Sequence, residues 1–451
     1  MLRAIDVNVK LGLRAAIERV GLHAMKRSHL LAGFAALALV ASPAAAQQSP
    51  EAVAEAALKA APVFDGHNDV PWALRGRVHN VIHDFDFVDT TDTATPDSDP
   101  PRAAMHTDLQ RLRKGHVGAQ FWSVYVPSND DEAEAVQQTI EQIDVAKRLI
   151  ARYPNDMMLA STAAELERAM KAGKVAGMLG MEGGHSIGSS LAVLRQMYAL
   201  GARYMTLTHG RNTPWADSAT DAPAHDGLTP FGEQVVREMN RIGMIVDLSH
   251  VSPATMKDAL AVSGAPVMFS HSGARGVADH PRNVPDDVLP LVKANGGVVM
   301  VVLYAAFLDP DLRRHGLDRT AEKARLDAQY LGDPAGGAAA LKAWDDAHPA
   351  PQVPIARAAD HIDHIRDAIG IDHIGIGGDY DGMDATPVGM EDVTGYPALF
   401  AELARRGYSQ ADLEKIASGN MLRVLKAVEA YAKAHAGDPP IETPVAGKVE
   451  D

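Results

Sequence analysis

The sequence predicts an α/β protein folded as a (β/α)8 barrel, and three observations support this prediction. Eight short apolar or β-branched runs have the length of buried strands. Segments with helical spacing alternate with these runs, which favours a parallel sheet built from βαβ units. Eight such units are the number that closes a barrel of this type. A doubly wound open sheet is the rival architecture, but no G-x-G-x-x-G pattern follows the first run, so its dinucleotide-binding form has no support.

The amino-terminal segment is set apart from the barrel. Residues 25–46 combine a basic start, an apolar run at 30–41 that is too short to span a bilayer, and an A-x-A cleavage pattern before Gln47. We therefore expect 25–46 to be a signal peptide. Residues 1–24 would be an upstream extension, with Met25 as the true start. The alternative interpretation is a short hydrophobic core helix.

The barrel elements follow from the periodicity of apolar residues. Runs rich in Val, Ile and aromatic residues between turn residues predict strands. They are residues 63–70, 118–126, 175–184, 203–209, 243–250, 266–272, 297–303 and 373–382. Apolar residues spaced by three and four predict the covering helices, most clearly at 132–153, where Val136, Ile140 and Ile143 share a face. The other predicted helices are 189–200, 230–242, 253–262 and 355–369.

Three segments do not fit this repeat. Residues 84–101 carry six aspartates and predict a polar excursion near the barrel mouth. A calcium loop is the alternative there, but the Gly and the twelfth-position Glu of an EF-hand are missing. Residues 313–354 predict an insertion between the seventh strand and its helix. A helical pattern at 408–434 is expected to cap the barrel domain, which we place at 47–436, and the tail 437–451 is expected to be mobile.

Composition narrows the class of partner. The chain has 43 basic and 58 acidic side chains, a formal charge of −15, and no cysteine. Such an acidic chain lacks the basic surface that binds nucleic acids or anionic membranes. The absence of thiols excludes disulfide scaffolds, zinc fingers, iron–sulfur proteins and cysteine nucleophiles. The expected partner is therefore a small molecule.

Six of the predicted strands end in side chains that commonly bind metals. These are His67 and Asp69 on the first strand, Glu182 on the third, His209 on the fourth, His250 on the fifth, His271 on the sixth, and Asp379 with Asp381 on the eighth. The carboxyl ends of barrel strands converge on one face, where active sites lie. Burying so many imidazoles and carboxylates together is costly unless a cation or mutual pairing compensates. Nitrogen and oxygen ligands without sulfur suit zinc, with manganese or cobalt as chemical alternatives.

Two pairs of residues, Asp379 with Asp381 and His361 with His364, could be confused with metal ligands or with each other. A period of two puts Asp379 and Asp381 on the same strand face, so spacing alone does not separate their roles. His361 and His364 lie three residues apart on the helix predicted at 355–369 and could imitate a ligand pair. They precede the eighth strand rather than end it, so we interpret them as solvated surface residues.

Eight ordered segments resemble those of one known family. They are residues 64–72, 120–125, 181–187, 207–217, 247–252, 269–272, 282–287 and 377–382. The chain resembles the membrane (renal) dipeptidase family, zinc-dependent relatives of the amidohydrolases with a barrel of the metal-dependent hydrolase type. Mammalian members carry disulfides and a lipid anchor. This chain has no cysteine and no hydrophobic carboxyl-terminal tail, so we expect neither device and no membrane anchor in the mature form.

The resemblance implies a site for two zinc ions per chain. His67 and Asp69 would bind one ion. His250 and His271 would bind the other, and Glu182 would bridge the two.

The resemblance also implies roles for three further side chains. His209 would bind substrate and donate to the oxyanion, and Arg282 would bind the substrate carboxylate. Asp379 would take a proton from the attacking water and pass it to the leaving amine. Without the matching segment, Arg282 would be interpreted as a surface arginine in a loop after the sixth strand.

The resulting hypothesis is a periplasmic or secreted zinc metallopeptidase. It would hydrolyse dipeptides, including those with a C-terminal D-residue, through a hydroxide shared by two zinc ions. A homodimer is common in the family that the chain resembles. Two alternatives stay open. One is a related amidohydrolase acting on N-acyl amino acids or lactones, which would not need Arg282. The other is a non-catalytic solute-binding barrel, against which the intact ligand set argues.

Overall fold

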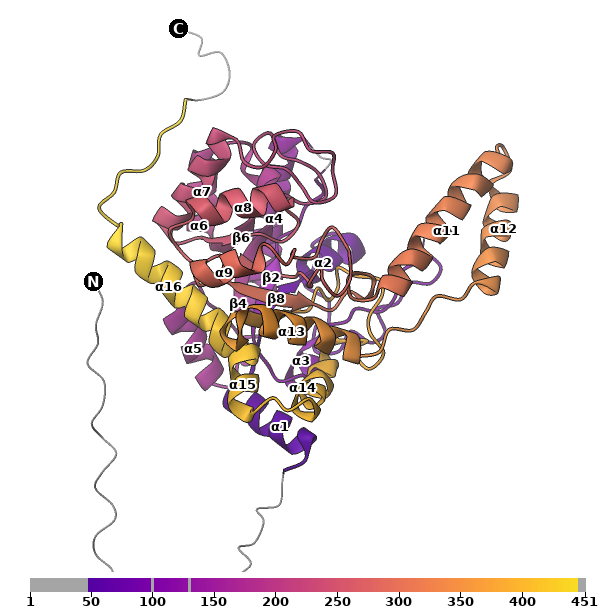
Figure 1. Ribbon diagram of the computed structural model, residues 1–451, viewed down its shortest axis with the longest axis horizontal. Coiled ribbons are helices and arrows are strands. Elements are labelled where there is room, and N and C mark those ends of the chain that lie inside the picture. Colours follow the sequence, from indigo (N-terminus) through magenta and orange to yellow (C-terminus); the bar gives the residue numbers. More distant parts are fainter. Residues whose placement is uncertain (1–47, 99–100, 129–130, 445–451) are drawn as a thin grey trace, which may run out of the picture. The chain divides into compact units, whose positions relative to one another are not determined.

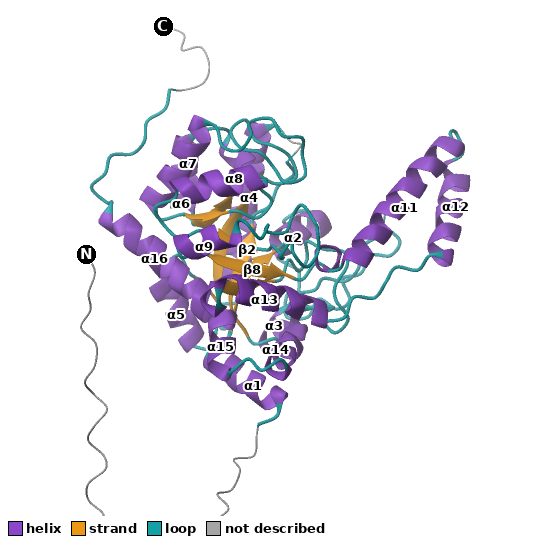
Figure 2. Ribbon diagram, in the orientation of Figure 1, coloured by secondary structure: helices purple, strands orange, loops and turns teal. Residues whose placement is uncertain are grey.

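The parallel strands of the chain close into a barrel (Figures 1 and 2). The computed structural model describes residues 48–98, 101–128 and 131–444. The ring runs β2–β1–β9–β8–β7–β6–β5–β4, and pairing of β2 with β4 closes it. Its strands are β1 (Val63–Asn68), β2 (Val117–Ser123), β4 (Val175–Glu182), β5 (Ala202–Thr206), β6 (Ile245–Asp247), β7 (Met268–Phe269), β8 (Val298–Val302) and β9 (Ile374–Gly377). The predicted (β/α)8 barrel is confirmed, and each ring strand corresponds to one of the predicted runs.

One further strand lies outside the ring. β3 (Met157–Leu159) pairs in parallel with the first residues of β4. β2 occupies the other edge of β4, and β5 pairs only with its second half. The strand was not predicted because three residues are too few to show a period.

Helices alternate with the ring strands and cover the barrel (Figure 2). They are α1 (Pro50–Ala60), α2 (Val70–Val78), α3 (Leu109–Lys114), α4 (Glu132–Arg152), α5 (Ala163–Lys171), α6 (Leu191–Leu200), α7 (Pro230–Ile242), α8 (Pro253–Val262), α9 (Leu289–Asn295), α10 (Ala305–Leu308), α11 (Pro310–Gln329), α12 (Pro334–Ala347), α13 (Ala356–Ile369), α14 (Tyr396–Arg405), α15 (Gln410–Glu414) and α16 (Asn420–Ala434). Short 3-10 turns lie at Gly184–Ile187, Ile371–His373 and Val393–Gly395, and a π-helical turn lies at Lys415–Gly419.

Capping residues explain why α7 and α8 span the residues that the sequence predicts. Thr229 and Ser252 precede them, and each side-chain oxygen accepts a backbone hydrogen bond from the first turn. A proline follows each cap, where its missing N–H costs nothing. α7 ends at Ile242 and is capped by Gly243, whose positive φ of 83° suits glycine at a helix C-cap.

Aromatic rings fill the barrel interior. The Phe64 and Phe121 rings stack with centroids 5.2 Å apart, and Tyr204 packs edge-on against Phe121 at 4.9 Å. Apolar residues of α16 belong to the same buried cluster, which agrees with the predicted cap. Nearer the mouth the backbones approach closely, because a Cβ atom at Gly377 would collide with the carbonyl oxygen of Ser270. This narrowness brings residues after β7 close to residues after β9.

The predicted insertion at 313–354 is a pair of helices. α11 and α12 run side by side and extend away from the barrel (Figure 1). Arg319 of α11 pairs with Asp345 of α12 at 2.7 Å. Leu326 is the only buried residue of α11, and α12 has none among the residues that the structure describes.

The predicted polar excursion forms neither a helix nor a strand in its described part. Arg77 of α2 donates hydrogen bonds to the carbonyl oxygens of Thr93 and Ala103, both at 2.6 Å. Within the described ranges, the side-chain groups that could hold an ion lie at the barrel mouth and none lies in this excursion. The structure therefore gives the calcium alternative no support.

Several predictions fall on residues outside the described ranges. They are the upstream extension at 1–24, the signal peptide at 25–46, and the last part of the tail, 445–451. Within the described part of the chain, no helix is both long and apolar enough to cross a membrane.

Candidate metal centre

The predicted site residues meet at the carboxyl ends of the ring strands. They lie on β1 or just after it (His67, Asp69), at the end of β4 (Glu182), and in the loops after β5 (His209), β6 (His250), β7 (His271) and β9 (Asp379). This is the face where barrel enzymes place their chemistry. The structure therefore brings together all seven side chains, although they span more than three hundred residues of sequence.

Glu182 lies at the centre of the cluster and is almost fully buried. Its Oε2 lies 3.3 Å from Nε2 of His67. Its Oε1 lies 3.0 Å from Nε2 of His250 and 3.5 Å from Nε2 of both His271 and His209. One oxygen of the carboxylate therefore faces His67, and the other faces three further imidazoles.

The carboxylates of Asp69 and Asp379 lie on the side of the cluster that faces His67. Nε2 of His67 lies 3.3 Å from Oδ2 of Asp69. Asp379 joins these two residues in a group whose potential ligand atoms lie within 4.8 Å of one another. The barrel mouth thus holds three overlapping ligand groups, which Glu182 and His67 link to one another.

The potential ligand atoms of the cluster fit a bound cation. Nε2 of His67 and Oδ1 of Asp69 are buried and make no hydrogen bond among the described residues. Nε2 of His250 lies 3.0 Å from Nε2 of His271, so two ring nitrogens point into the same space. Leaving buried polar atoms unpaired is costly, and a cation bound between them would satisfy them. Imidazole and carboxylate donors without sulfur fit zinc.

Hydroxyl groups fix the orientation of two of the imidazoles. Nδ1 of His67 lies 2.8 Å from the Tyr204 hydroxyl, and Nδ1 of His271 lies 2.8 Å from Oγ of Ser270. Ser270 donates in turn to Oδ2 of Asp247 at 2.6 Å, so Nδ1 of His271 must carry the proton. Its Nε2 lone pair is then free for a metal.

Asp65 ties the ends of β1 and β9 together. Its carboxylate accepts hydrogen bonds from the backbone N–H of His67 at 3.1 Å and of Gly378 at 2.7 Å. It also accepts the Tyr396 hydroxyl at 2.5 Å. Asp65 therefore sets the relative position of the segments that carry His67 and Asp379. Sequence reasoning missed it, although an aspartate inside a buried apolar run was a usable signal.

The electrostatics of the cluster favour positive charge at its centre. Burial alone would lower the pKa of His67, but the neighbouring phenol and carboxylates raise it well above its ordinary value. Burial alone would raise the pKa of Glu182, but the surrounding imidazoles lower it well below its ordinary value. Both shifts show that Glu182 is held as a carboxylate and stabilises positive charge beside it.

Three side chains at the rim of the cluster have the properties of reacting or binding groups. Burial raises the pKa of Asp379 to about 8, near the range in which a carboxyl group can both release and accept a proton. Burial lowers the pKa of His209 to about 4, so its ring is neutral at pH 7. Burial also lowers the pKa of Arg282 to about 10, which leaves the guanidinium charged.

Arg282 presents a buried cation with free donors. Its side chain lies over the ring of Phe307, with the guanidinium carbon 5.4 Å from the ring centroid. Nη2 donates weakly to the carbonyl of His271 at 3.5 Å. Nε and Nη1 are buried and have no hydrogen-bond partner in the described ranges. Arg282 is 3% exposed, so the interpretation of it as a surface residue, which the resemblance set aside, is wrong. A small anion would satisfy the free donors.

The two aspartates after β9 are separated by backbone conformation. The expectation that both lie on one strand face is wrong, because β9 ends at Gly377. Asp379 and Asp381 both have positive φ, 63° and 65°. Asp379 faces the cluster, whereas Oδ1 of Asp381 accepts the backbone N–H of His106 at 2.9 Å.

The interpretation of His361 as a surface residue is also wrong. Its ring is fully buried on the inner face of α13. Nδ1 accepts the backbone N–H of Ala274 at 2.8 Å, and Nε2 lies 3.0 Å from the carbonyl oxygen of Leu308. His364 is partly exposed and pairs with Asp286 at 2.8 Å. Neither histidine belongs to the cluster.

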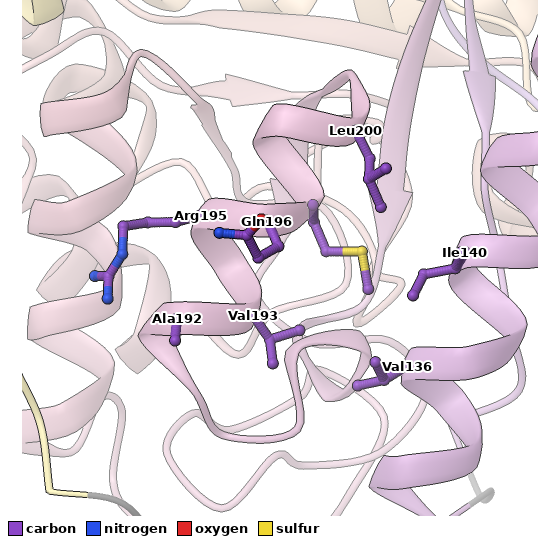
Figure 3. Close-up of a pocket in the computed structure, with 8 residues that line it drawn as sticks. Val136, Ile140, Ala192, Val193, Arg195, Gln196 and Leu200 are labelled. Atoms are coloured by element: carbon purple, nitrogen blue, oxygen red, sulfur yellow. The ribbon is translucent and has the colours of Figure 1, made fainter.

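A pocket elsewhere on the molecule offers no such chemistry. It lies between α4 and α6 and has a volume of about 330 Å³ (Figure 3). Its lining residues are Val136, Ile140, Ala192, Val193, Arg195, Gln196, Met197 and Leu200. The lining holds neither a carboxylate nor an imidazole, so it cannot hold a metal of the kind considered above.

Comparison with known proteins agrees with this geometry. The family model described as membrane dipeptidase (peptidase family M19) matches residues 51–438. Dipeptidase 3 of Rattus norvegicus is 42% identical over 386 residues, which cover 84% of this chain and 68% of that protein. Dipeptidase 3 of Macaca fascicularis is 40% identical over 394 residues, covering 86% and 70%.

Solved structures give the same result. The probable dipeptidase PvdM from Pseudomonas aeruginosa is similar with a TM-score of 0.72 and 25% identity, covering 85% of this chain and 99% of that one. A metallopeptidase from Rhodobacter sphaeroides, liganded with a phosphinate mimic of the dipeptide L-Ala-D-Ala, has a TM-score of 0.66 and 25% identity, covering 82% and 99%.

Proposed function

Because the chain belongs to the membrane dipeptidase family, peptidase family M19, we propose that it is an exported dipeptidase that works with two zinc ions. The observation that best supports the proposal is the position of the Glu182 carboxylate. Oε2 of Glu182 lies 3.3 Å from Nε2 of His67, and this nitrogen is also 3.3 Å from Oδ2 of Asp69. Oε1 faces His250 and His271. A carboxylate with one oxygen toward each ligand group can bridge two ions.

The bound ions would supply electrophilic chemistry, and the protein side chains would supply the rest. Bound zinc lowers the pKa of water and polarises a carbonyl group. Asp379 accepts the proton of the attacking water and passes it to the leaving amine. His209 donates a hydrogen bond to the oxygen on which negative charge develops. Arg282 pairs with the substrate's terminal carboxylate and so orients the scissile bond toward Asp379.

The same arginine limits the length of the substrate. A buried guanidinium close to the cluster can reach a carboxylate only one residue beyond the scissile bond, so dipeptides fit and longer peptides do not. We extend the proposal to dipeptides with a C-terminal D-residue. The similar Rhodobacter sphaeroides metallopeptidase, liganded with a mimic of L-Ala-D-Ala, supports this choice.

Export rests on the sequence alone. The basic start, short apolar run and A-x-A pattern of residues 25–46 support delivery to the periplasm or the medium. The exported chain would begin at Gln47, which amino-terminal sequencing measures. A different first residue would contradict the cleavage site.

The function is tested by separating dipeptides from acylated amino acids. Purified wild type, Arg282→Ala and Arg314→Ala are assayed on Gly-D-Ala, N-acetyl-D-alanine and a lactone, with zinc quantified. Arg314 lies exposed on α11 and is the control. We expect wild type and Arg314→Ala to hydrolyse the dipeptide with two zinc ions per chain. Arg282→Ala should lose at least about 30-fold in kcat/KM, equivalent to about 2 kcal/mol for a buried charged contact.

Each alternative predicts a different result. Equal dipeptide turnover by Arg282→Ala, or preference for the acylated amino acid or the lactone, would indicate a related amidohydrolase. Fewer than two metal ions per chain after zinc loading, with no hydrolysis of any substrate, would indicate a solute-binding barrel.

A further inference from the structure

The loop that carries Asp379 has a strained backbone. Asp379 and Asp381 adopt positive φ, a conformation that non-glycine residues avoid unless neighbouring contacts impose it. Between β9 and the next turn, the N–H of Asp379 donates to the carbonyl of His67 at 3.0 Å. The N–H of Gly382 donates to the carbonyl of Asp379 at 3.2 Å. The second bond closes the turn that contains Asp381, but neither bond uses the N–H of Asp381 itself.

His106 supplies a partner for that N–H from a distant part of the chain. Its backbone N–H donates to Oδ1 of Asp381 at 2.9 Å, and its Nδ1 accepts the backbone N–H of Asp381 at 3.0 Å. A backbone N–H can only donate, so Nδ1 of His106 carries no proton and the ring is protonated on Nε2. The two residues therefore form a reciprocal pair, each serving once as donor and once as acceptor.

His106 is itself fixed on several sides. Its carbonyl oxygen accepts the N–H of Val393 at 3.3 Å, and its ring packs edge-on against Tyr380 at 5.9 Å. The next residue, Thr107, accepts a hydrogen bond from the Asn68 side chain at 2.8 Å. The segment that follows the polar excursion is thus anchored to the end of β1 and to the loop after β9.

The anchored loop contacts both functional aspartates. The carbonyl of Tyr380 accepts the N–H of Asp69 at 2.9 Å. A Cβ atom at Gly382 would collide with the carboxylate of Asp69 and lie 3.0 Å from Oδ1 of Asp379. Any shift of this loop therefore moves Asp379 relative to Asp69 and its neighbours.

We propose that His106 is a positioning residue that holds the strained loop 378–382 so that Asp379 faces the substrate. The inference rests on the proposed dipeptidase function, in which Asp379 moves a proton. It also assigns a role to the segment that follows the polar excursion, which places His106 beside the loop after β9. Because His106 acts through Asp381, its loss should affect the chemical step and leave substrate binding by Arg282 unchanged.

Three variants separate positioning from general stability. His106→Leu keeps a side chain against Tyr380 but removes the acceptor for the Asp381 N–H. His106→Asn puts a carbonyl oxygen close to the position of Nδ1 and should restore the bond. His83→Leu is the control, because His83 belongs to the same part of the chain and its side chain is 73% exposed. His106→Ala replaces the first variant if it does not fold.

The experiment measures kinetics, zinc content and hydrogen exchange of zinc-loaded and zinc-free protein. We expect kcat of His106→Leu on Gly-D-Ala to fall about tenfold to a hundredfold, the scale of a misplaced catalytic group. Its KM should stay within about twofold of the wild-type value, because His106 makes no contact with the substrate. Zinc content should be unchanged, and the amides of 378–382 should exchange faster. His106→Asn and His83→Leu should resemble the wild type.

The outcomes distinguish this inference from the proposed function. Wild-type kcat in His106→Leu, or equal impairment of His106→Asn and His106→Leu, overturns the positioning role. If the wild type hydrolyses no dipeptide, the proposed function fails. Hydrogen exchange then still tests the contact between His106 and Asp381. Unchanged exchange at 378–382 in His106→Leu would show that His106 does not hold the loop.

Discussion

At the scale of single residues, the charge of Glu182 is the property on which the site depends. Its carboxylate is buried beneath four imidazoles, within 3.5 Å of each. A neutral group of the same shape would keep the packing but remove the anion that makes the centre attractive to cations. Glu238 offers a useful comparison, since it is another fully buried carboxylate, paired with Arg195 and Arg241 at 2.9 and 2.6 Å.

Glu182→Gln should therefore lose metal, and Glu238→Gln should not. We expect less than one zinc ion per chain in Glu182→Gln and a loss of activity of at least a hundredfold, with the fold retained. Glu238→Gln should keep two ions and full activity but lose roughly 1.5–3 kcal/mol of stability with its charged hydrogen bonds. Metal analysis and thermal unfolding of both proteins measure this. Equal zinc content in the two variants would contradict the bridging role.

Most of the site could be predicted from the residue types at strand ends. The groups that orient those residues could not be predicted. His67 and His271 could be named because six converging strands end in imidazoles or carboxylates, which are costly to bury together without a cation. Tyr204 and Ser270, which contact their Nδ1 atoms, resemble ordinary core residues in the sequence. Only the folded barrel shows that a tyrosine 137 residues from His67 lies 2.8 Å from its ring.

At the scale of elements, the pair α11 and α12 is held to the barrel where its two ends meet. Asp309 caps the start of α11, and Arg357 of α13 donates to it at 2.9 Å. The two ends of the insertion therefore lie next to each other. Since α12 buries no residue in the described part of the chain, the barrel core gains little from this pair.

Replacing residues 311–351 with a short Gly/Ser linker should leave the barrel intact. We expect Tm to stay within about 3 °C of the wild type, because loop length changes stability only slowly. Zinc content should stay at two per chain, and kcat/KM on Gly-D-Ala should stay within about threefold. Scanning calorimetry and kinetic assays measure these values. Arg357→Ala in the full chain is the contrasting variant. It should lower Tm, because it removes the hydrogen bond between Arg357 and Asp309. Insoluble linker protein would contradict the prediction.

Helix ends were easier to predict than strand ends, for a physical reason. Caps and prolines mark the start of α7 and α8 in the sequence itself. The runs at 243–250 and 266–272 predict longer strands than β6 and β7, which have three and two residues. Their remaining residues leave the sheet to carry His250 and His271, and apolar periodicity contains no sign of that departure.

At the scale of the whole molecule, closure of the ring is what turns scattered residues into a site. β2 pairs with β4, so the strands that carry His67 and Glu182 are separated by β2 alone. An open sheet would leave those strand ends in a line. The sequence could predict eight units, but closure depends on pairings between residues far apart in the chain, which no local pattern records.

A closed ring that gathers buried imidazoles and carboxylates should depend on its metal for stability. A ligand that binds only the folded state at a hundredfold excess over its Kd stabilises it by about 2.7 kcal/mol. For a domain of this size the unfolding entropy makes each kcal/mol worth about 1.2 °C in Tm, so losing about 5.4 kcal/mol with two ions should lower Tm by roughly 5–10 °C. Calorimetry of the zinc-loaded, chelated and zinc-restored protein measures this, and restoration should recover the loss. Glu182→Gln, already depleted of metal, should not respond to the chelator. The same Tm in all three wild-type states would mean that the imidazoles and carboxylates offset the cost of their burial by pairing with one another, without a cation.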